Sequence, residues 1–133
     1  MTRATPFLMF QGNAEAALDL YFATFPDSRF VSVERYAKGS PGPEGTIKVA
    51  RFALCGREFM CSDSPIKHGF SFTPASSIFV EFETVEALDH AFAVLADGGQ
   101  VLMPLDDYGF SPRFGWLDDR FGVSWQLSLP LAS

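Results

Sequence analysis

The sequence predicts an α+β protein built from two βαβββ modules, and three observations lead to this prediction. Residues 15–25 (EAALDLYFATF) and 86–96 (EALDHAFAVLA) share a Glu, an Ala-Leu-Asp triplet and an aromatic residue, in register at an offset of 70 residues from Ala17 onward. Each segment has helical periodicity and stands between one short apolar stretch and about three further stretches with the strand pattern. A four-stranded sheet covered by one helix leaves its second apolar face open. We therefore expect two modules side by side in a cupped mixed sheet, with both helices outside.

All 133 residues are expected to form a single domain. Module one spans about 5–62 and module two about 77–129. The segment between them, 63–76, contains Ile66, Phe70 and Phe72, and these apolar residues indicate an ordered linker.

The first module opens with a strand and a helix. Residues 5–10 (TPFLMF) suit a short buried strand, and Asn13 stands where the N-cap residue of the following helix is expected. Pro26 closes this helix, because proline cannot continue it. The apolar stripe of the helix consists of Ala14, Ala17, Leu18, Tyr21, Phe22 and Phe25.

Three strands complete the first module. Residues 29–36 alternate as a strand does, and 37–45 form a loop rich in Gly and Pro. Residues 46–55 and 57–62 are expected to pair as a hairpin with Gly56-Arg57 as its two-residue turn. In that register Cys55 and Cys61 lie on opposite faces of the sheet, so both thiols are expected to be reduced.

The second module repeats the order. Residues 76–82 form a strand, Thr84 caps the helix that follows, and Gly98-Gly99 stops it. Residues 100–105 form the next strand. The apolar stripe of this helix consists of Val85, Leu88, Phe92 and Leu95.

The final hairpin is expected to join residues 108–117 to residues 123–129. Asp118-Asp119 starts its turn, since Asp favours turn positions; a pair of catalytic carboxylates is the alternative interpretation. One face of the last strand carries Val123, Trp125, Leu127 and Leu129, and the other carries Ser124, Gln126 and Ser128. We expect Trp125 to lie beneath a helix and Gln126 to line the cup.

Composition excludes several classes of function. The formal net charge is −6, the sequence pI is about 4.7, and the ten Lys and Arg residues are scattered singly. A nucleic-acid partner is not expected, because phosphate contacts require clustered basic residues. No stretch approaches the ~18–20 apolar residues that span a bilayer, and no charged leader precedes an apolar segment. We expect a cytoplasmic protein with no membrane partner.

Three stretches resemble a known family. FQGNAEAALDLYFATFPDSRF, GPEGTIKVARFALCGREFM and GWLDDRFGVSWQL are similar to the PhnB-like branch of the vicinal oxygen chelate (glyoxalase/bleomycin-resistance/dioxygenase) superfamily, and the resemblance runs from about Thr5 to Leu129. Members of this branch are often labelled 3-demethylubiquinone-9 3-methyltransferase domain proteins. The resemblance implies a glyoxalase-like fold, a homodimer and a small-molecule site in the cup.

The resemblance also implies four positions at which metal-dependent relatives carry ligands. In this sequence they are Thr5, Ser62 (or its neighbours Met60 and Cys61), Ser77 and Gln126. Hydroxyls and an amide carry no charge, whereas zinc, iron or manganese sites use imidazole, carboxylate or thiolate. We therefore expect no metal and no other cofactor. Asp63 and His68 leave residual metal binding open, and His90 is expected to be a solvated helix residue.

The function favoured by these residues is small-molecule binding, with an enzyme less favoured. The turn Gln11-Gly12-Asn13 has one glycine and is not a nucleotide-binding loop, so methyltransferase activity is not expected. One alternative is a metal-dependent lyase, isomerase or dioxygenase of the same superfamily. Another is a dimerising scaffold without a ligand.

Candidate ligand-binding residues come from both modules. Gln126 is the first, and Trp116 either walls the pocket or packs at a subunit contact. Tyr108, Phe110 and Arg113 suit a pocket for an aromatic or carboxylate-bearing ligand. Alternatively, Arg113 makes a structural ion pair with Asp106 or Asp107. Arg51 and Met60 share a sheet face in the first module and are further candidates.

Overall fold

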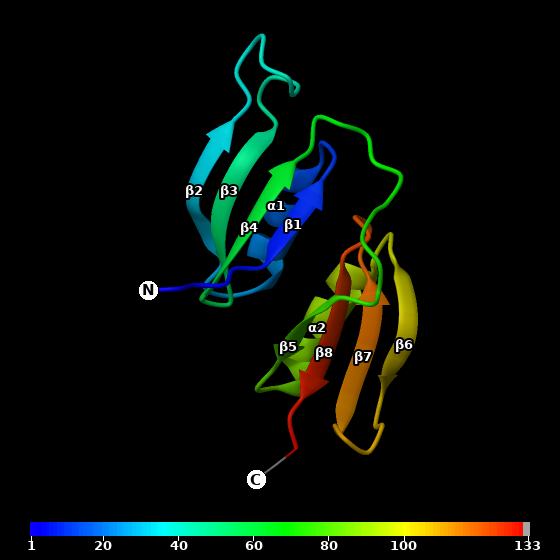
Figure 1. Ribbon diagram of the computed structural model, residues 1–133. Coiled ribbons are helices and arrows are strands. Elements are labelled where there is room, and N and C mark those ends of the chain that lie inside the picture. Colours follow the sequence, from blue (N-terminus) through cyan, green and yellow to red (C-terminus); the bar gives the residue numbers. More distant parts are fainter. Residues whose placement is uncertain (132–133) are drawn as a thin grey trace. The chain divides into compact units, whose positions relative to one another are not determined.

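The computed structural model describes residues 1–131 and contains two compact units, Met1–Gly69 and the chain from Phe70 onward. Each unit has one four-stranded sheet and one helix (Figure 1). The first unit contains β1 (Phe7–Phe10), α1 (Ala14–Thr24), β2 (Arg29–Arg35), β3 (Ile47–Leu54) and β4 (Arg57–Asp63). The second contains β5 (Ser77–Glu81), α2 (Val85–Ala96), β6 (Gln100–Asp106), β7 (Arg113–Asp118) and β8 (Ser124–Leu129).

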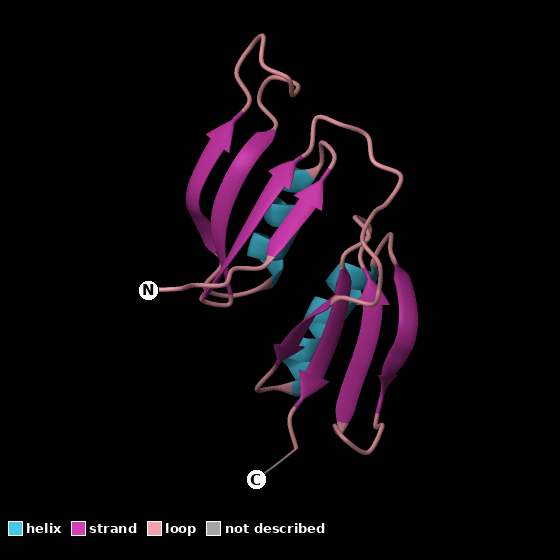
Figure 2. Ribbon diagram, in the orientation of Figure 1, coloured by secondary structure: helices cyan, strands magenta, loops and turns pink. Residues whose placement is uncertain are grey.

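The two sheets have the same topology. Their strand orders are β1-β4-β3-β2 and β5-β8-β7-β6, with the first strand of each unit parallel to the last and the remaining pairs antiparallel. In each unit the helix lies against one face of the sheet (Figure 2). The predicted α+β class with two βαβββ modules is confirmed.

Helix α1 buries the stripe that its periodicity predicts. Ala14, Ala17, Leu18 and Tyr21 are fully covered and Phe25 is 3% exposed, whereas Phe22 is half-buried and contacts the rings of Phe30 and Phe52. The other large side chains of this core come from β1, β3 and β4. They are Phe10, Ile47, Phe52, Leu54 and Cys61.

The cap of α1 differs from the prediction. Asn13 occupies the N-cap position, but its side chain makes no capping hydrogen bond. The carboxylate of Asp63 accepts the N–H groups of Gly12 and Ala14 instead. Asp63 is the last residue of β4, one position beyond the strand expected from the sequence, and is only 2% exposed.

The β3–β4 turn also differs from the prediction. Leu54 pairs with Arg57, so the turn residues are Cys55 and Gly56 rather than Gly56 and Arg57. Both have positive φ, 52° and 81°, which is the conformation of a type I′ turn. Cys55 is therefore exposed in the turn and Cys61 is buried under α1, and the two thiols are unpaired as expected.

Helix α2 is capped as expected, because the Thr84 hydroxyl accepts the Ala87 N–H at 3.2 Å. Leu88, Ala91 and Leu95 are buried. Val85 was expected in the buried stripe but is 40% exposed at the first position of the helix. No helix within residues 1–131 is long and apolar enough to cross a lipid bilayer.

The last hairpin is shorter than predicted. β7 begins at Arg113, and residues 108–112 form a loop. Trp125 is fully buried and Leu127 lies on the same covered face, as predicted. Asp119 builds the turn: its Oδ1 accepts the N–H groups of Phe121 and Val123, and its Oδ2 accepts the Trp125 indole N–H at 2.9 Å.

Candidate functional site

The face of the second sheet that points away from α2, which we call the outer face, carries two of the predicted site residues, Gln126 and Trp116. Because side chains alternate along a strand, Gln126 lies on the opposite face from the buried Trp125. Gln126 on β8 is in register with Phe79 on β5 and with Trp116 on β7. Trp116 is in turn in register with Met103 on β6. These four residues form one row across the four strands, which we call the Gln126 row. In this row the Gln126 amide lies between the side chains of Phe79 and Trp116.

The Gln126 amide is half-buried, and no side chain or backbone group within residues 1–131 hydrogen-bonds to it. A buried amide without a partner costs about 1–3 kcal/mol. Here the partial exposure lets the amide meet water or a ligand from the open side of the sheet. Gln126 is therefore a polar group ready to accept an external partner.

Trp116 is oriented by a hydroxyl pair. Its indole N–H donates to Ser124 Oγ at 2.8 Å, and Ser124 Oγ lies 2.7 Å from Ser77 Oγ. Ser124 is buried, so this bond holds the indole in one position on the outer face. The position of Ser77 corresponds to a metal ligand in the metal-dependent relatives. Here the Ser77 hydroxyl instead makes a hydrogen bond with another neutral hydroxyl.

The loop between β6 and β7 adds aromatic rings to the outer face. The Tyr108 and Phe110 rings stack with centroids 6.2 Å apart, and both meet Phe114 edge-on. Phe114 in turn lies 6.3 Å from Phe79. The Tyr108 hydroxyl donates to the Pro104 carbonyl at 2.6 Å. Phe79 and Phe110 are more than half exposed, so this aromatic cluster borders the Gln126 row as an open surface.

Arg113 lies on the other face of the second sheet. Its Nε donates to the Asp89 carboxylate on α2, and the guanidinium is about one-third exposed. The ion pair that the sequence left open is therefore made with Asp89 and not with Asp106 or Asp107. The structure does not bring Arg113 together with Gln126.

Asp118 is an unusual carboxyl at the edge of the Gln126 row. It is in register with Ser124 on the outer face, and its Oδ1 is buried without a hydrogen-bond partner within residues 1–131. Burial, and then the neighbouring Asp119 charge, raise the pKa of Asp118 above its ordinary value. Asp119 builds the turn, as predicted for the pair, whereas Asp118 lies on the outer face in register with Ser124.

The remaining candidates lie in the first unit. Arg51 and Met60 are directly paired across β3 and β4. Together with Met1, Arg3 and Thr5 they line a hollow of about 550 Å³. The Arg51 guanidinium donates to Glu58 at 2.8 Å, which neutralises its charge.

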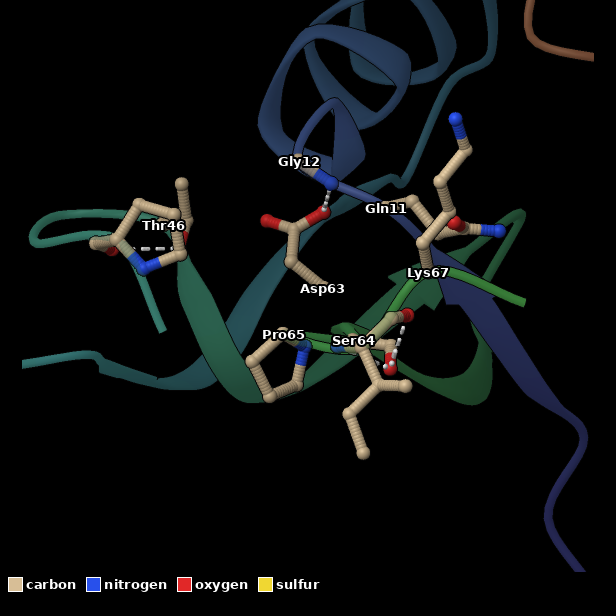
Figure 3. Close-up of a pocket in the computed structure, with 9 residues that line it drawn as sticks. Gln11, Gly12, Thr46, Asp63, Ser64, Pro65 and Lys67 are labelled. Carbon is tan, nitrogen blue, oxygen red and sulfur yellow. Dashed lines mark hydrogen bonds between the residues drawn. The ribbon is translucent and has the colours of Figure 1, made fainter. Parts of the chain in front are cut away.

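A second hollow in this unit, of about 320 Å³, lies at the start of α1 (Figure 3). Figure 3 shows the Asp63 carboxylate pointing toward the Gly12 amide. Asp63 Oδ2 accepts the Ile47 N–H at 2.9 Å, so both oxygens are occupied by backbone donors. His68 Nε2 lies 2.8 Å from Ser64 Oγ. Neither Asp63 nor His68 is therefore placed as a free ligand for a metal.

The donor set does not fit the metal that the superfamily implies. Thr5 precedes β1, Ser62 pairs with Met9, Ser77 bonds to a hydroxyl, and Gln126 is a neutral amide. Divalent transition metals require imidazole, carboxylate or thiolate donors. Within residues 1–131 no three His, Cys, Asp or Glu side chains gather where they could hold a metal ion.

Two residues of the Gln126 row were missed from the sequence. Phe79 stands two positions after Ser77 on the same strand, so alternation places it on the face already assigned to Ser77. Met103 carried no such signal, because its place depends on a register shift in the pairing of β6 with β7. His90 is exposed on α2, as expected.

The two βαβββ units, each with four strands and one helix, have the topology of the glyoxalase-like fold, and solved structures share this fold. A mutant of the fosfomycin resistance protein FosX from Listeria monocytogenes, in complex with Mn(II) and 1S,2S-dihydroxypropylphosphonic acid, has the same fold at 12% identity. Its TM-score is 0.65, over 98% of this chain and 93% of that one.

The chain belongs to the 3-demethylubiquinone-9 3-methyltransferase family, whose sequence profile matches residues 2–128. A PhnB protein from Bacillus cereus is 52% identical, with a TM-score of 0.93 over 96% of this chain and 99% of that one. Protein PA1353 from Pseudomonas aeruginosa is 26% identical, with a TM-score of 0.83 and 98% of each chain covered. Protein YjdN from Escherichia coli (strain K12) is 25% identical over 94% of this chain and 93% of its own length.

Proposed function

We propose that the protein binds a small molecule without a metal ion, and that the outer face of the second sheet contacts this ligand. The observation that carries the proposal is the half-buried Gln126 amide, which has no bonding partner within residues 1–131 and stands between Phe79 and Trp116. Small-molecule sites combine apolar and aromatic walls with a few polar groups that fix orientation. Trp116, Tyr108 and Phe110 supply the aromatic surface beside that amide.

Methyl transfer is not part of this proposal. Methyl transfer from a nucleotide-type donor needs a site for that donor, and the β1–α1 turn at Gln11-Gly12-Asn13 directs its amides to Asp63 rather than to a phosphate. The carboxylate of Asp63 therefore occupies the backbone N–H groups that a phosphate would need. We propose binding, as in sequestration or sensing, as the role.

The binding proposal is tested by a fragment screen with thermal shift and ¹H–¹⁵N chemical-shift mapping. We expect heteroaromatic fragments to shift the Gln126 side-chain amide and the Trp116 indole resonances, and Gln126→Leu to weaken binding at least fivefold. Gln11→Leu is the matched control, because Gln11 is an exposed amide of the first unit. A screen without hits would refute binding and favour the scaffold alternative.

Three further parts of the proposal have their own measurements. We propose that the protein is a cytoplasmic homodimer, and light scattering should return twice the 14.6 kDa chain mass. Metal analysis of protein purified without a His tag should return no stoichiometric metal. A stoichiometric metal that Gln126→Ala abolishes would replace the proposal with the metal-dependent enzyme alternative.

A further inference from the structure

The charges on the outer face of the second sheet are all of one sign. Glu81, Asp106 and Asp118 are in register with Ser128, Phe114 and Ser124, respectively, and so lie on the same face as Gln126. None of the three makes an ion pair with any residue from 1 to 131. Three carboxylates without an ion-pair partner within residues 1–131 therefore share this face with the aromatic side chains.

The strands of this sheet supply no positive charge to balance them. Arg113 is the only Lys or Arg in β5–β8. It lies on the opposite face, paired with Asp89. An anionic group brought to the outer face meets charges of its own sign only, and like charges repel each other. A cationic or neutral group meets no such opposition.

The Gln126 amide specifies a complementary edge on the ligand. A carboxamide presents one acceptor oxygen and an NH₂ donor side by side. Its best partner is another group with a donor beside an acceptor, such as a carboxamide, a lactam or a heterocycle edge, as glutamine shows when it pairs with adenine. Phe79 and Trp116, in register on either side, favour a flat ring over an aliphatic group because ring faces and edges attract one another.

We propose that the ligand is a planar heteroaromatic molecule that carries a hydrogen-bond donor beside an acceptor and no negative charge. This inference rests on the proposed function and deepens it, because it excludes carboxylate- and phosphate-bearing ligands from the outer face. Gln126 pairs with the ligand edge, the aromatic side chains contact its ring, and the three carboxylates select against anions.

Three probes of nearly the same shape test the proposal by isothermal titration calorimetry at pH 7 and low salt. They are quinoline-2-carboxamide, quinoline-2-carboxylate and N-(2-aminoethyl)quinoline-2-carboxamide, which are neutral, anionic and cationic. We expect the amide and the cation to bind about tenfold more tightly than the carboxylate, with the cation weakened by added salt. Gln126→Leu should weaken the neutral amide at least fivefold.

Charge removal identifies the cause of the selectivity. The double variant Glu81→Gln/Asp118→Asn should strengthen carboxylate binding about threefold or more while leaving the amide within about twofold. Glu86→Gln is the matched control, because Glu86 is an exposed carboxyl on α2, which covers the other face. The control should leave all three affinities unchanged.

The outcomes separate this inference from the proposed function. If the carboxylate binds as tightly as the amide, or more tightly, the inference is overturned while small-molecule binding stands. The same holds if the amide binds and Gln126→Leu has no effect. If none of the three probes binds at millimolar concentration, both the inference and the proposed function are overturned.

Discussion

The carboxylate of Asp63 caps the first turn of α1 by accepting the Ala14 N–H at 2.9 Å across 49 positions of sequence. The same side chain accepts the Gly12 N–H, and through Oδ2 the Ile47 N–H on β3. One buried side chain therefore joins the helix to two strands of the first sheet. The residue at the N-cap position, Asn13, makes no such bond.

Asp63→Ala should destabilise the protein by about 3 kcal/mol or more, because it removes a helix cap and leaves buried backbone donors unpaired. Urea denaturation followed by circular dichroism measures the change. Asn13→Ala is the control and should cost less than about 0.5 kcal/mol, since it removes no side-chain cap. Equal losses for the two variants would contradict this assignment of the cap.

The two thiols should react at very different rates. Burial, and then the Asp63 charge, raise the pKa of Cys61 to about 12, so this thiol stays protonated at pH 8 and is covered by α1. Cys55 is exposed in the β3–β4 turn, although partial desolvation and Asp27 raise the pKa of its thiol. Titration with a thiol reagent should therefore find one thiol in the native protein and both after unfolding. Two fast thiols, or none, would refute the prediction.

Gly115 is required by the close approach of α2 to β7. A Cβ at this position would lie 2.4 Å from the Phe92 ring and 2.9 Å from Leu105. Gly115→Ala should therefore cost about 1–3 kcal/mol through overpacking. Gly69→Ala is the matched control, because its Cβ meets no atom within 4 Å and its φ is not positive. Denaturation curves of the two variants should differ accordingly, and a neutral Gly115→Ala would show that the helix can shift freely.

Asp118 should make stability depend on pH. Burial and the Asp119 charge raise its pKa in the folded protein, so the folded state binds this proton more tightly than the unfolded chain does. The carboxyl therefore favours folding below its unfolded pKa of about 3.9, and that contribution is lost as the pH rises through the folded value. Asp118→Asn resembles the protonated form and should raise the melting temperature at pH 7 but not at pH 3.5. Glu86→Gln is the exposed control, and a constant difference across pH would contradict the mechanism.

The local features of the fold were predictable because they depend on short-range patterns. Helix periodicity and the Thr84 cap placed α2, and period-two alternation placed Trp125 under the helix and Gln126 opposite it. The turn of the first hairpin was wrong by one residue. A type I′ turn needs positive φ at both central positions, and the sequence did not reveal that Cys55 adopts one.

One position in the candidate site followed from the same alternation, because Gln126 lies opposite Trp125 as expected. Trp116 is in register with Gln126, and the Tyr108 and Phe110 rings border this face. Arg113 lies on the other face, because side chains alternate along β7 and its neighbour Phe114 lies on the outer face. Its partner, Asp89, is 24 positions away. A residue's face follows from its strand, but its partner depends on which helix covers that face.

By itself, the sequence determined the duplicated module, the two helices, the alternation of each strand and the weak donors at the metal-ligand positions. These follow from residue types and from periods of two and 3.6. Only the tertiary structure decided that Asp63 caps α1, that Asp89 neutralises Arg113, and that three carboxylates with no ion-pair partner within residues 1–131 share a face with Gln126. The reason is that hydrogen bonds and charges act between atoms within a few ångströms of each other, and folding alone sets which distant residues come that close.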